Sequence, residues 1–252
     1  MTGYNMTDSM ANLLINSNQL SRSNLNGATE TNEPKRALYI GRFQMLHNGH
    51  LGVLKFIESQ SDVDEIIIGI GSSQYSRFNK SFEAPLLMNP FTFEERKAYV
   101  ERVFDDNIKK PYKVCGIMDQ HDHARWVKHT FTVVPKISYI YTNNKEEMDA
   151  FSKAGYECRR FPLSSNYNAT LIRELMANDG PWEQYVPSAV KDVVKEKELD
   201  KIVKELFASN VSEVEAIHKN RIRRGELSYA DFLIQESLSK DINQNISING
   251  GI

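Results

Sequence analysis

The sequence predicts an α/β fold, a doubly wound parallel sheet with helices on both faces, flanked by polar N- and C-terminal extensions. From residue 37 onward, short apolar segments alternate with longer segments of helical periodicity, as in strands joined by crossover helices. Residues 65–70 (Glu-Ile-Ile-Ile-Gly-Ile) are nearly continuous in apolar character, which is typical of a strand buried on both faces. Residues 1–34 lack both patterns and contain seven asparagines, so the sheet is expected to begin after a polar tail.

The elements follow in chain order. The expected strands are residues 37–40, 65–70, 112–116, 137–141 and 156–160. The expected helices are residues 49–59, 92–104, 124–132, 145–154, 169–177 and 188–207. The pattern is weaker afterwards, where helices are expected at 211–219 and 228–239 with Gly225 as a stop between them.

The composition divides the chain into a disordered polar tail at 1–34, a folded domain at 35–207 and a helical or polar extension at 208–252. The tail has one arginine against three acids and no basic start before an apolar run, which argues against a targeting peptide. The last residues, 243–252, are polar and are expected to fray.

Charge and cysteine content exclude several classes of protein. The 31 Lys and Arg residues nearly balance the 33 Asp and Glu residues, whereas a nucleic-acid coat needs excess cations. No apolar run approaches the roughly 18 residues of a membrane span. The two cysteines, Cys115 and Cys158, cannot build a disulfide framework. We therefore expect a soluble cytoplasmic protein with neither nucleic acid nor membrane as partner.

Residues 41–50 (Gly-Arg-Phe-Gln-Met-Leu-His-Asn-Gly-His) directly follow the first expected strand. A loop between a strand and a helix N-terminus presents free N–H groups and a positive dipole end, which together suit a phosphate. His47 and His50 are three residues apart and can both donate ring N–H groups to such an anion, and Gly49 has no side chain to obstruct it.

Metal binding is the weaker interpretation of these histidines, because the local sequence fixes no third ligand. His121-Asp122-His123 is better explained as an exposed polar loop. The basic run at 218–224 is better explained as a solvated helix end, since Glu213, Glu215 and Glu226 dilute its charge. No metal site is predicted from protein side chains.

A set of motifs extends over residues 37–204, and together they resemble the archaeal-type nicotinamide mononucleotide adenylyltransferases of the nucleotidyltransferase superfamily. Besides residues 41–50, the motifs are Ile-Gly-Ile-Gly-Ser-Ser-Gln at 68–74, Asn-Pro-Phe-Thr-Phe-Glu-Glu-Arg at 89–96, Trp-Val-x-His at 126–129, Tyr-Thr-Asn-Asn at 141–144, Ala-Gly-Tyr-Glu at 154–157 and Tyr-Asn-Ala-Thr-Leu-Ile-Arg at 167–173. The resemblance implies a Rossmann-like sheet, a homo-oligomer, and conversion of ATP and nicotinamide mononucleotide into NAD and pyrophosphate with Mg²⁺.

In this reaction a phosphate of the mononucleotide attacks the α-phosphorus of ATP, so positioning and charge stabilisation suffice for catalysis. We expect His47 and His50 on the ATP phosphates, with His50 nearest the α-phosphate. Arg173 is expected to hold the β- and γ-phosphates. Thr170 with its neighbouring N–H groups, and Arg42, would add donors.

The remaining expected site residues concern the acceptor and the base of ATP. Trp126 is expected to stack on the nicotinamide ring, with a core tryptophan as the alternative. Phe43 and Gln44 would line the same pocket, and Gly41 is a further expected substrate-binding residue. Ser72 and Gln74 lie where the strand order is expected to reverse, and Asn143 and Asn144 are assigned to adenine or ribose; without the resemblance, these two asparagines would be turn residues.

The chain departs from the family pattern at a few positions. Asn168 stands for a serine, although asparagine can still cap the helix. Met45-Leu46 replaces Pro-Phe, the loop before Pro90 is longer than usual, and both tails are additional. Met88 stands where the family has an arginine, and Arg77 or Lys80 is the candidate replacement.

Two alternatives remain. One is a related nucleotidyltransferase acting on a pantetheine, flavin or glycerol phosphate, against which Arg-Phe-Gln at 42–44 and Trp126 argue. The other is a catalytically silent nucleotide-binding regulator. The presence of His47, His50 and Arg173 together argues against silence.

Overall fold

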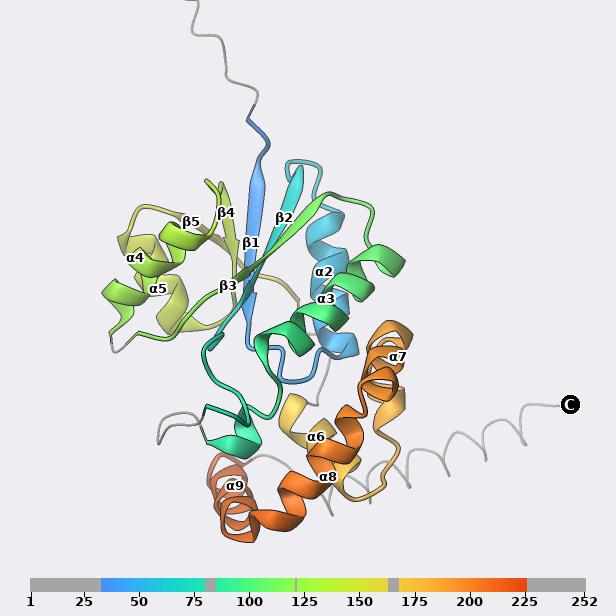
Figure 1. Cartoon of the computed structure of the whole chain (residues 1–252). Helices are drawn as coiled ribbons and strands as arrows, with labels where there is room; N and C mark the ends of the chain where they lie inside the picture. Colours follow the sequence, from blue (N-terminus) through green and yellow to red (C-terminus); the bar gives the residue numbers. More distant parts are fainter. Residues whose placement is uncertain (1–32, 80–84, 121, 163–167, 226–252) are drawn as a thin grey trace, which may run out of the picture. The chain divides into compact units, whose positions relative to one another are not determined.

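The computed structural model describes residues 33–79, 85–120, 122–162 and 168–225, and of Arg221 and Ile222 only the backbone. Within these ranges, five strands form one parallel sheet in the order β3-β2-β1-β4-β5 (Figure 1). The strands are β1 (Arg36–Gly41), β2 (Glu65–Ile70), β3 (Tyr112–Gly116), β4 (Tyr139–Tyr141) and β5 (Glu157–Arg159). The predicted fold class is confirmed.

The strand order reverses beside β1. The chain passes through α2 (Asn48–Glu58) and α3 (Phe93–Asn107) to β2 and β3, and then returns through α4 (His123–Val133) to β4. β4 pairs with the opposite edge of β1, where Leu38 is in register with Ile140, and α5 (Lys145–Lys153) leads to β5. The carboxyl ends of β1 and β4 therefore form the switch point at which sheets of this kind bind ligands.

Both faces of the sheet are covered. Ala37 and Tyr39 of β1 belong to the apolar cluster that α2, α3 and the later helices complete, whereas Leu38 belongs to the cluster under α4 and α5. The two helix layers lie on opposite sides of the strands (Figure 1). Burial on both faces explains why the β2 sequence is apolar without alternation, as its pattern predicts.

The later helices lie beyond the carboxyl ends of the strands (Figure 1). They are α6 (Ala169–Ala177), η2 (Trp182–Tyr185), α7 (Ser188–Glu196), α8 (Leu199–Ser209) and α9 (Val211–Arg223), and the short helix η1 (Leu86–Met88) contacts α8. This placement puts α6, α9 and η1 next to the loop that follows β1.

The single helix expected at 188–207 is wrong. Glu198 has a left-handed conformation (φ 52°) and separates α7 from α8. The break allows α7 to bury Val190 and Val193 beside α3, while α8 buries Leu199 and Val203 beside α6. A straight helix presents one face only, so two separate packing partners explain the turn.

The other expected strands and helices within the described residues agree with the observed ones within a few residues at their ends, whereas the short helices η1 and η2 were not predicted. Gly225 follows α9 with a φ of 67°, as a helix stop requires. Three expectations concern residues outside the described ranges: the disordered tail (apart from residues 33–34), the helix at 228–239 and the frayed end at 243–252.

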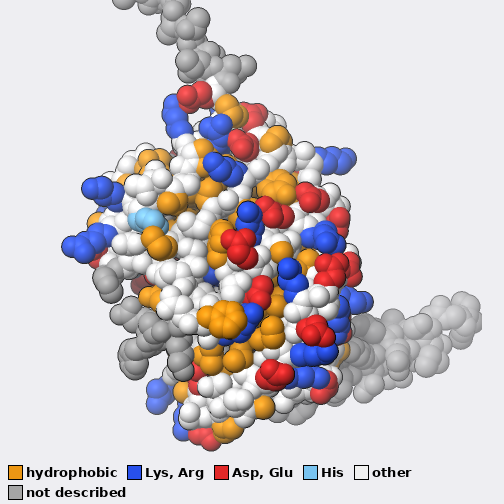
Figure 2. Space-filling model, viewed as in Figure 1, with side chains coloured by type: hydrophobic (Ala, Val, Ile, Leu, Met, Phe, Trp, Pro, Cys, Tyr) orange, Lys and Arg blue, Asp and Glu red, His pale blue; other side chains and the backbone are white. Residues whose placement is uncertain are grey.

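The described residues from Lys35 onward form one compact unit. Within the described ranges, no helix combines the length and the apolar character that crossing a bilayer requires. On the face drawn in Figure 2, acidic and basic side chains are interspersed, in agreement with the net charge of −2.

Candidate active site

The loop after β1 is held rigidly by its own residues. Phe43 has a positive φ of 47°, which is uncommon outside glycine, and its ring packs over Gly41. A Cβ on Gly41 would lie 2.9 Å from Cζ of Phe43, so only glycine fits beneath the ring. Met45 and Leu46, which replace the Pro-Phe of the family pattern, are fully buried and belong to the packing of this loop.

Arg96 of α3 ties this loop to the loop after β2. Its side chain is fully buried, and its Nη1 donates to the carbonyl oxygens of Arg42 and Gly71, both at 2.8 Å. Its Nη2 donates to the carbonyl oxygen of Ser72 at 3.1 Å. The two loops at the switch point are thus positioned by one guanidinium.

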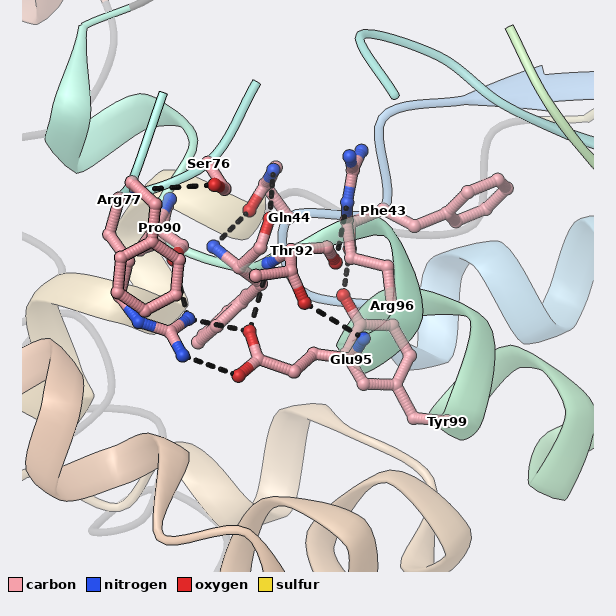
Figure 3. Close-up of polar contacts among 11 residues, drawn as sticks. Phe43, Gln44, Ser76, Arg77, Pro90, Thr92, Glu95, Arg96 and Tyr99 are labelled. Carbon is pink, nitrogen blue, oxygen red and sulfur yellow. Dashed lines mark hydrogen bonds and ion pairs between the residues drawn. The ribbon is translucent and has the colours of Figure 1, made fainter. Parts of the chain in front are cut away.

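α3 begins with a capping box that places these groups. Thr92 accepts from the N–H of Glu95, and the Glu95 carboxylate accepts from the N–H of Thr92 at 2.8 Å. The same carboxylate binds the guanidinium of Arg77 in a bidentate pair, with both N–O distances 2.6 Å (Figure 3). Arg77 is therefore engaged with α3 and lines neither pocket described below, and Lys80 lies outside the described residues.

A cavity of about 630 Å³ opens at the N-terminus of α6, and we call it the α6 pocket. Its walls come from the loop after β1, the first turns of α2 and α6, η1 and α9. The expected site residues that line it are Arg42, Phe43, Gln44, His47, His50, Thr170 and Arg173. The N-termini of two helices, α2 and α6, therefore meet at one cavity, which is an arrangement suited to phosphates.

The two histidines are stacked, with ring centroids 3.7 Å apart. Burial lowers the pKa of His47 to about 4, and burial followed by the charge of His47 lowers the pKa of His50 well below its ordinary value. Both rings are consequently neutral at pH 7. The backbone N–H of His47 donates to Nδ1 of His50 at 3.2 Å, so the proton of the neutral His50 ring resides on Nε2. Gly49 is buried between them in the first turn of α2.

Arg173 is fixed inside the wall of the α6 pocket. It is 1% exposed, and its guanidinium donates to the carbonyl oxygens of Leu87 and Gln44. Its Nη2 lies 3.3 Å from the hydroxyl oxygen of Thr170, and burial lowers its pKa to about 9. Most of its donors therefore brace the site, and only the edge beside Thr170 remains for the expected contact with phosphates.

Gln44 has a similar bracing function. Its amide Nε2 donates to the carbonyl oxygen of Phe91 at 3.1 Å, and its Oε1 accepts from the N–H of Phe91 at 2.9 Å. Asn168 caps α6 by accepting from the N–H of Leu171 at 3.1 Å, which confirms that asparagine can replace the serine of the family pattern.

A second cavity, of about 320 Å³, lies at the switch point, and we call it the switch-point pocket. The expected residues Gly41, Arg42, Ser72, Trp126 and Asn144 line it. Phe43 and Gln44 were expected beside Trp126, but they line the α6 pocket instead, so that expectation is wrong. Arg42 lines both pockets. Trp126 also packs against Phe151 of the apolar core, with ring centroids 5.2 Å apart. Its side chain therefore contacts the core and lines the pocket.

Three expected residues have other contacts in the structure. Asn144 caps α5 through bonds from the N–H groups of Glu146 and Glu147, while still lining the switch-point pocket. Asn143 makes a two-way amide contact with the backbone of Phe161, 18 residues along the chain, and lines neither pocket. Gln74 makes the same kind of contact with the backbone of Asp119 and lies outside both pockets.

Two groups of pocket residues are absent from the sequence-based expectations. The acidic side chains of Asp119, Glu146 and Glu147 line the switch-point pocket. α9, which was assigned to a C-terminal extension, contributes Glu213, Ile217 and Asn220 to the α6 pocket. The amphipathic spacing of Val214 and Ile217 indicates that α9 packs on the domain, but no sequence pattern indicates where. Among the described residues, no group of three or more His, Cys, Asp or Glu side chains could hold a metal ion.

The fold and the two pockets define a nucleotidyltransferase, and the chain belongs to the cytidylyltransferase-like family, whose model matches residues 38–225. The match includes α9. The nicotinamide-nucleotide adenylyltransferase of Thermococcus onnurineus is 37% identical over 186 residues, which cover 72% of this chain and 93% of that protein. The protein of the same name from Thermoplasma acidophilum is 38% identical over 169 residues, 66% of this chain and 89% of that protein. Within the wider family, the chain is a member of the nicotinamide-nucleotide adenylyltransferases.

A solved structure supports the fold. The bifunctional NMN adenylyltransferase/ADP ribose pyrophosphatase of Francisella tularensis, in complex with AMP and a manganese ion, has a TM-score of 0.55 and 23% identity over 76% of this chain. The chain spans 56% of the length of that protein, and the likeness concerns the fold.

Proposed function

We propose that this enzyme transfers the adenylyl group of ATP to nicotinamide mononucleotide, with the triphosphate in the α6 pocket and the mononucleotide in the switch-point pocket. The observation that carries this assignment is the position of Arg42, which lines both pockets where they meet. A reaction that joins two phosphate-bearing substrates needs a cation at their junction, and a planar guanidinium suits phosphate oxygens.

The chemistry needs no protein nucleophile. A phosphate oxygen of the mononucleotide attacks the α-phosphorus of ATP, the bond from that phosphorus to the bridging oxygen of the β-phosphate breaks, and pyrophosphate leaves. Charge accumulates on the transferring group and on the leaving pyrophosphate, so oriented N–H donors stabilise the transition state. The Nε2–H of His50, the N-termini of α2 and α6, and Arg42 are donors of this kind.

In the switch-point pocket, Trp126 offers a ring face for the nicotinamide, and the acidic side chains nearby suit its pyridinium charge. Glu147 accepts from the hydroxyl of Thr142 at 2.7 Å, and burial raises its pKa. ATP and nicotinamide mononucleotide are thus bound in environments of opposite electrostatic character.

Mg²⁺ is the proposed metal, and it fits a site in which the substrate carries the ion. Mg²⁺ keeps several waters and is commonly bound through substrate phosphates with few protein carboxylates. The lining of the α6 pocket is rich in donors, and its acidic side chain, Glu213, accepts a backbone N–H. When bound, the ion neutralises the phosphate oxygens of ATP. The manganese ion in the Francisella tularensis protein is consistent with this proposal.

One assay tests the assignment against its alternatives. The protein is mixed with ATP, Mg²⁺ and nicotinamide mononucleotide, or with a pantetheine, flavin or glycerol phosphate, and pyrophosphate and dinucleotide are measured together. We expect equal amounts of NAD and pyrophosphate with nicotinamide mononucleotide. Pyrophosphate release with another acceptor alone, or ATP binding without any release, would replace this function by one of the alternatives.

The homo-oligomer and the cytoplasmic location are also proposals. Light scattering of the purified protein tests whether it is a homo-oligomer.

A further inference from the structure

α9 forms a wall of the α6 pocket, although it lies far along the chain from the phosphate-binding motifs. Asn220 of α9 and Arg224, which directly follows the helix, both line the cavity beside Arg42 and Arg173. The family motifs of the sequence analysis assign no substrate contact to this segment, so only the structure shows that α9 lines the pocket.

Contacts at three places hold α9 against the pocket. The carboxylate of Glu213 accepts from the backbone N–H of Leu87 in η1 at 2.6 Å. Nε2 of His218 lies 3.5 Å from a carboxylate oxygen of Glu174, a buried residue of α6. Ile217 is buried and belongs to the same apolar cluster as α8. The helix is therefore oriented by both neighbouring walls, which fixes the direction in which its last turn points.

The distribution of charge explains what this last turn can do. Among the described residues that line the α6 pocket, His47 and His50 are neutral, and the guanidinium of Arg173 is largely bonded to backbone carbonyls. Arg42 and Arg224 are the exposed arginines of this lining. Arg42 lies at the junction with the switch-point pocket, whereas Arg224 lies at the α9 wall. A triphosphate extends over several ångströms, so a second cation is needed away from the reacting phosphorus.

We propose that Arg224, assisted by Asn220, binds the terminal phosphates of ATP and the pyrophosphate that leaves. This inference rests on the proposed function for the identity of the nucleotide. Arg224 touches the substrate at its non-reacting end, so it contributes mainly to the affinity for ATP. Arg42, at the junction, contributes to both substrates.

The test compares Arg224→Ala with Arg223→Ala in the full chain. Arg223 is also exposed and precedes Arg224 directly, but it does not line the pocket, so its substitution removes the same charge without the proposed contact. Isothermal titration with ATP and Mg²⁺, without acceptor, gives the affinity. Steady-state kinetics with nicotinamide mononucleotide gives the KM of each substrate.

We expect Arg224→Ala to weaken ATP binding about tenfold, the loss of one charge-assisted contact, and Arg223→Ala to change it less than about twofold. The KM for nicotinamide mononucleotide should stay the same in both variants. Equal ATP affinity of the two variants, or a matching loss for the acceptor, would overturn the inference. The wild-type chain could also bind ATP without making NAD, while Arg224→Ala weakens that binding. In that case the proposed function fails and the inference stands.

Discussion

The two pockets that meet at Arg42 differ in the sign of their electrostatic character. The α6 pocket is lined by two helix N-termini, neutral histidines and arginines, whereas the switch-point pocket carries Asp119, Glu146 and Glu147 beside Trp126. The first environment suits a polyanion and the second suits a pyridinium ring with a neutral amide. The net charge of −2 conceals this division, because acids in one pocket offset cations in the other. The proposed function accordingly places the donor nucleotide and the acceptor on separate sides of this arginine.

Arg96 supports both pockets at once, and its loss should have the largest effect. Arg96→Met would leave the carbonyl oxygens of Arg42, Gly71 and Ser72 buried without a donor. We expect unfolding to become easier by roughly 3–5 kcal/mol, since each such group costs about 1–3 kcal/mol. Urea unfolding measures this cost. Arg102→Ala, on an exposed part of the same helix, is the control, and a similar loss in both variants would contradict the role of Arg96.

His50 lines the α6 pocket but not the switch-point pocket, so its substitution tests the α6 pocket by itself. His50→Ala should lower kcat by about 100- to 1,000-fold, which corresponds to one well-aimed donor in the transition state. His50→Gln places an amide N–H near the position of Nε2, whereas His50→Asn places it near Nδ1. The glutamine variant should therefore retain more activity than the asparagine variant. Equal rates for these two variants would show that the Nε2 proton of His50 does not act on the substrate.

The lowered pKa values of the histidines predict a pH dependence of stability. The unfolded chain protonates a histidine near pH 6.5, but folded His47 does so only near 4, so the folded state binds fewer protons between these values. The stabilisation is complete above about pH 6.5 and is lost as the pH falls towards 4, by up to about 1.4 kcal/mol per pH unit for each histidine.

Urea unfolding at about pH 7, 6 and 5 checks this prediction. A variant with both His47→Gln and His50→Gln lacks the two titrating rings, so its stability should decrease less steeply over the same range. Parallel curves for the variant and the wild-type chain would show that the two rings are not buried and neutral in the folded protein.

Asp119 tests the acidic character of the switch-point pocket, and its substitution has the smallest expected effect. The acidic wall of the switch-point pocket should favour nicotinamide mononucleotide over nicotinate mononucleotide, whose ring carries a carboxylate. Asp119→Asn should reduce this preference a few-fold, as expected for one partly solvated charge. The ratio of kcat/KM for the two acceptors measures it. Asp149→Asn, on α5 but outside this pocket, is the control, and a wild-type preference for nicotinate would contradict the acidic wall's proposed role.

The parts of the fold and site that the sequence predicts well depend on contacts over a few residues. The loop and helix start at 41–50 and the cap at Asn168 follow from a strand, a helix N-terminus and one side chain. The prediction of one helix over residues 188–207 failed, because the break between α7 and α8 depends on which helices each of them packs against. Local patterns carry no information on those partners.

The polar residues that the sequence places less well have partners far along the chain. Arg77 pairs with Glu95 and Asn143 with Phe161, each 18 residues away, and Gln74 binds Asp119 across 45 residues. The position of α9 depends on a bond between Glu213 and Leu87, which are 126 residues apart. Motifs identify the residue types of a site, whereas tertiary contacts decide which of them face the cavity and which brace it.

The most direct test of the two-pocket account is the kinetics of Arg42→Ala with both substrates varied. The backbone of residue 42, which Arg96 holds, is unchanged by this substitution, so the loop should keep its position. Since Arg42 lines both pockets, the account predicts that the KM values for ATP and for nicotinamide mononucleotide both rise, by about tenfold each. An increase for one substrate alone would contradict the claim that the two nucleotides meet at this arginine.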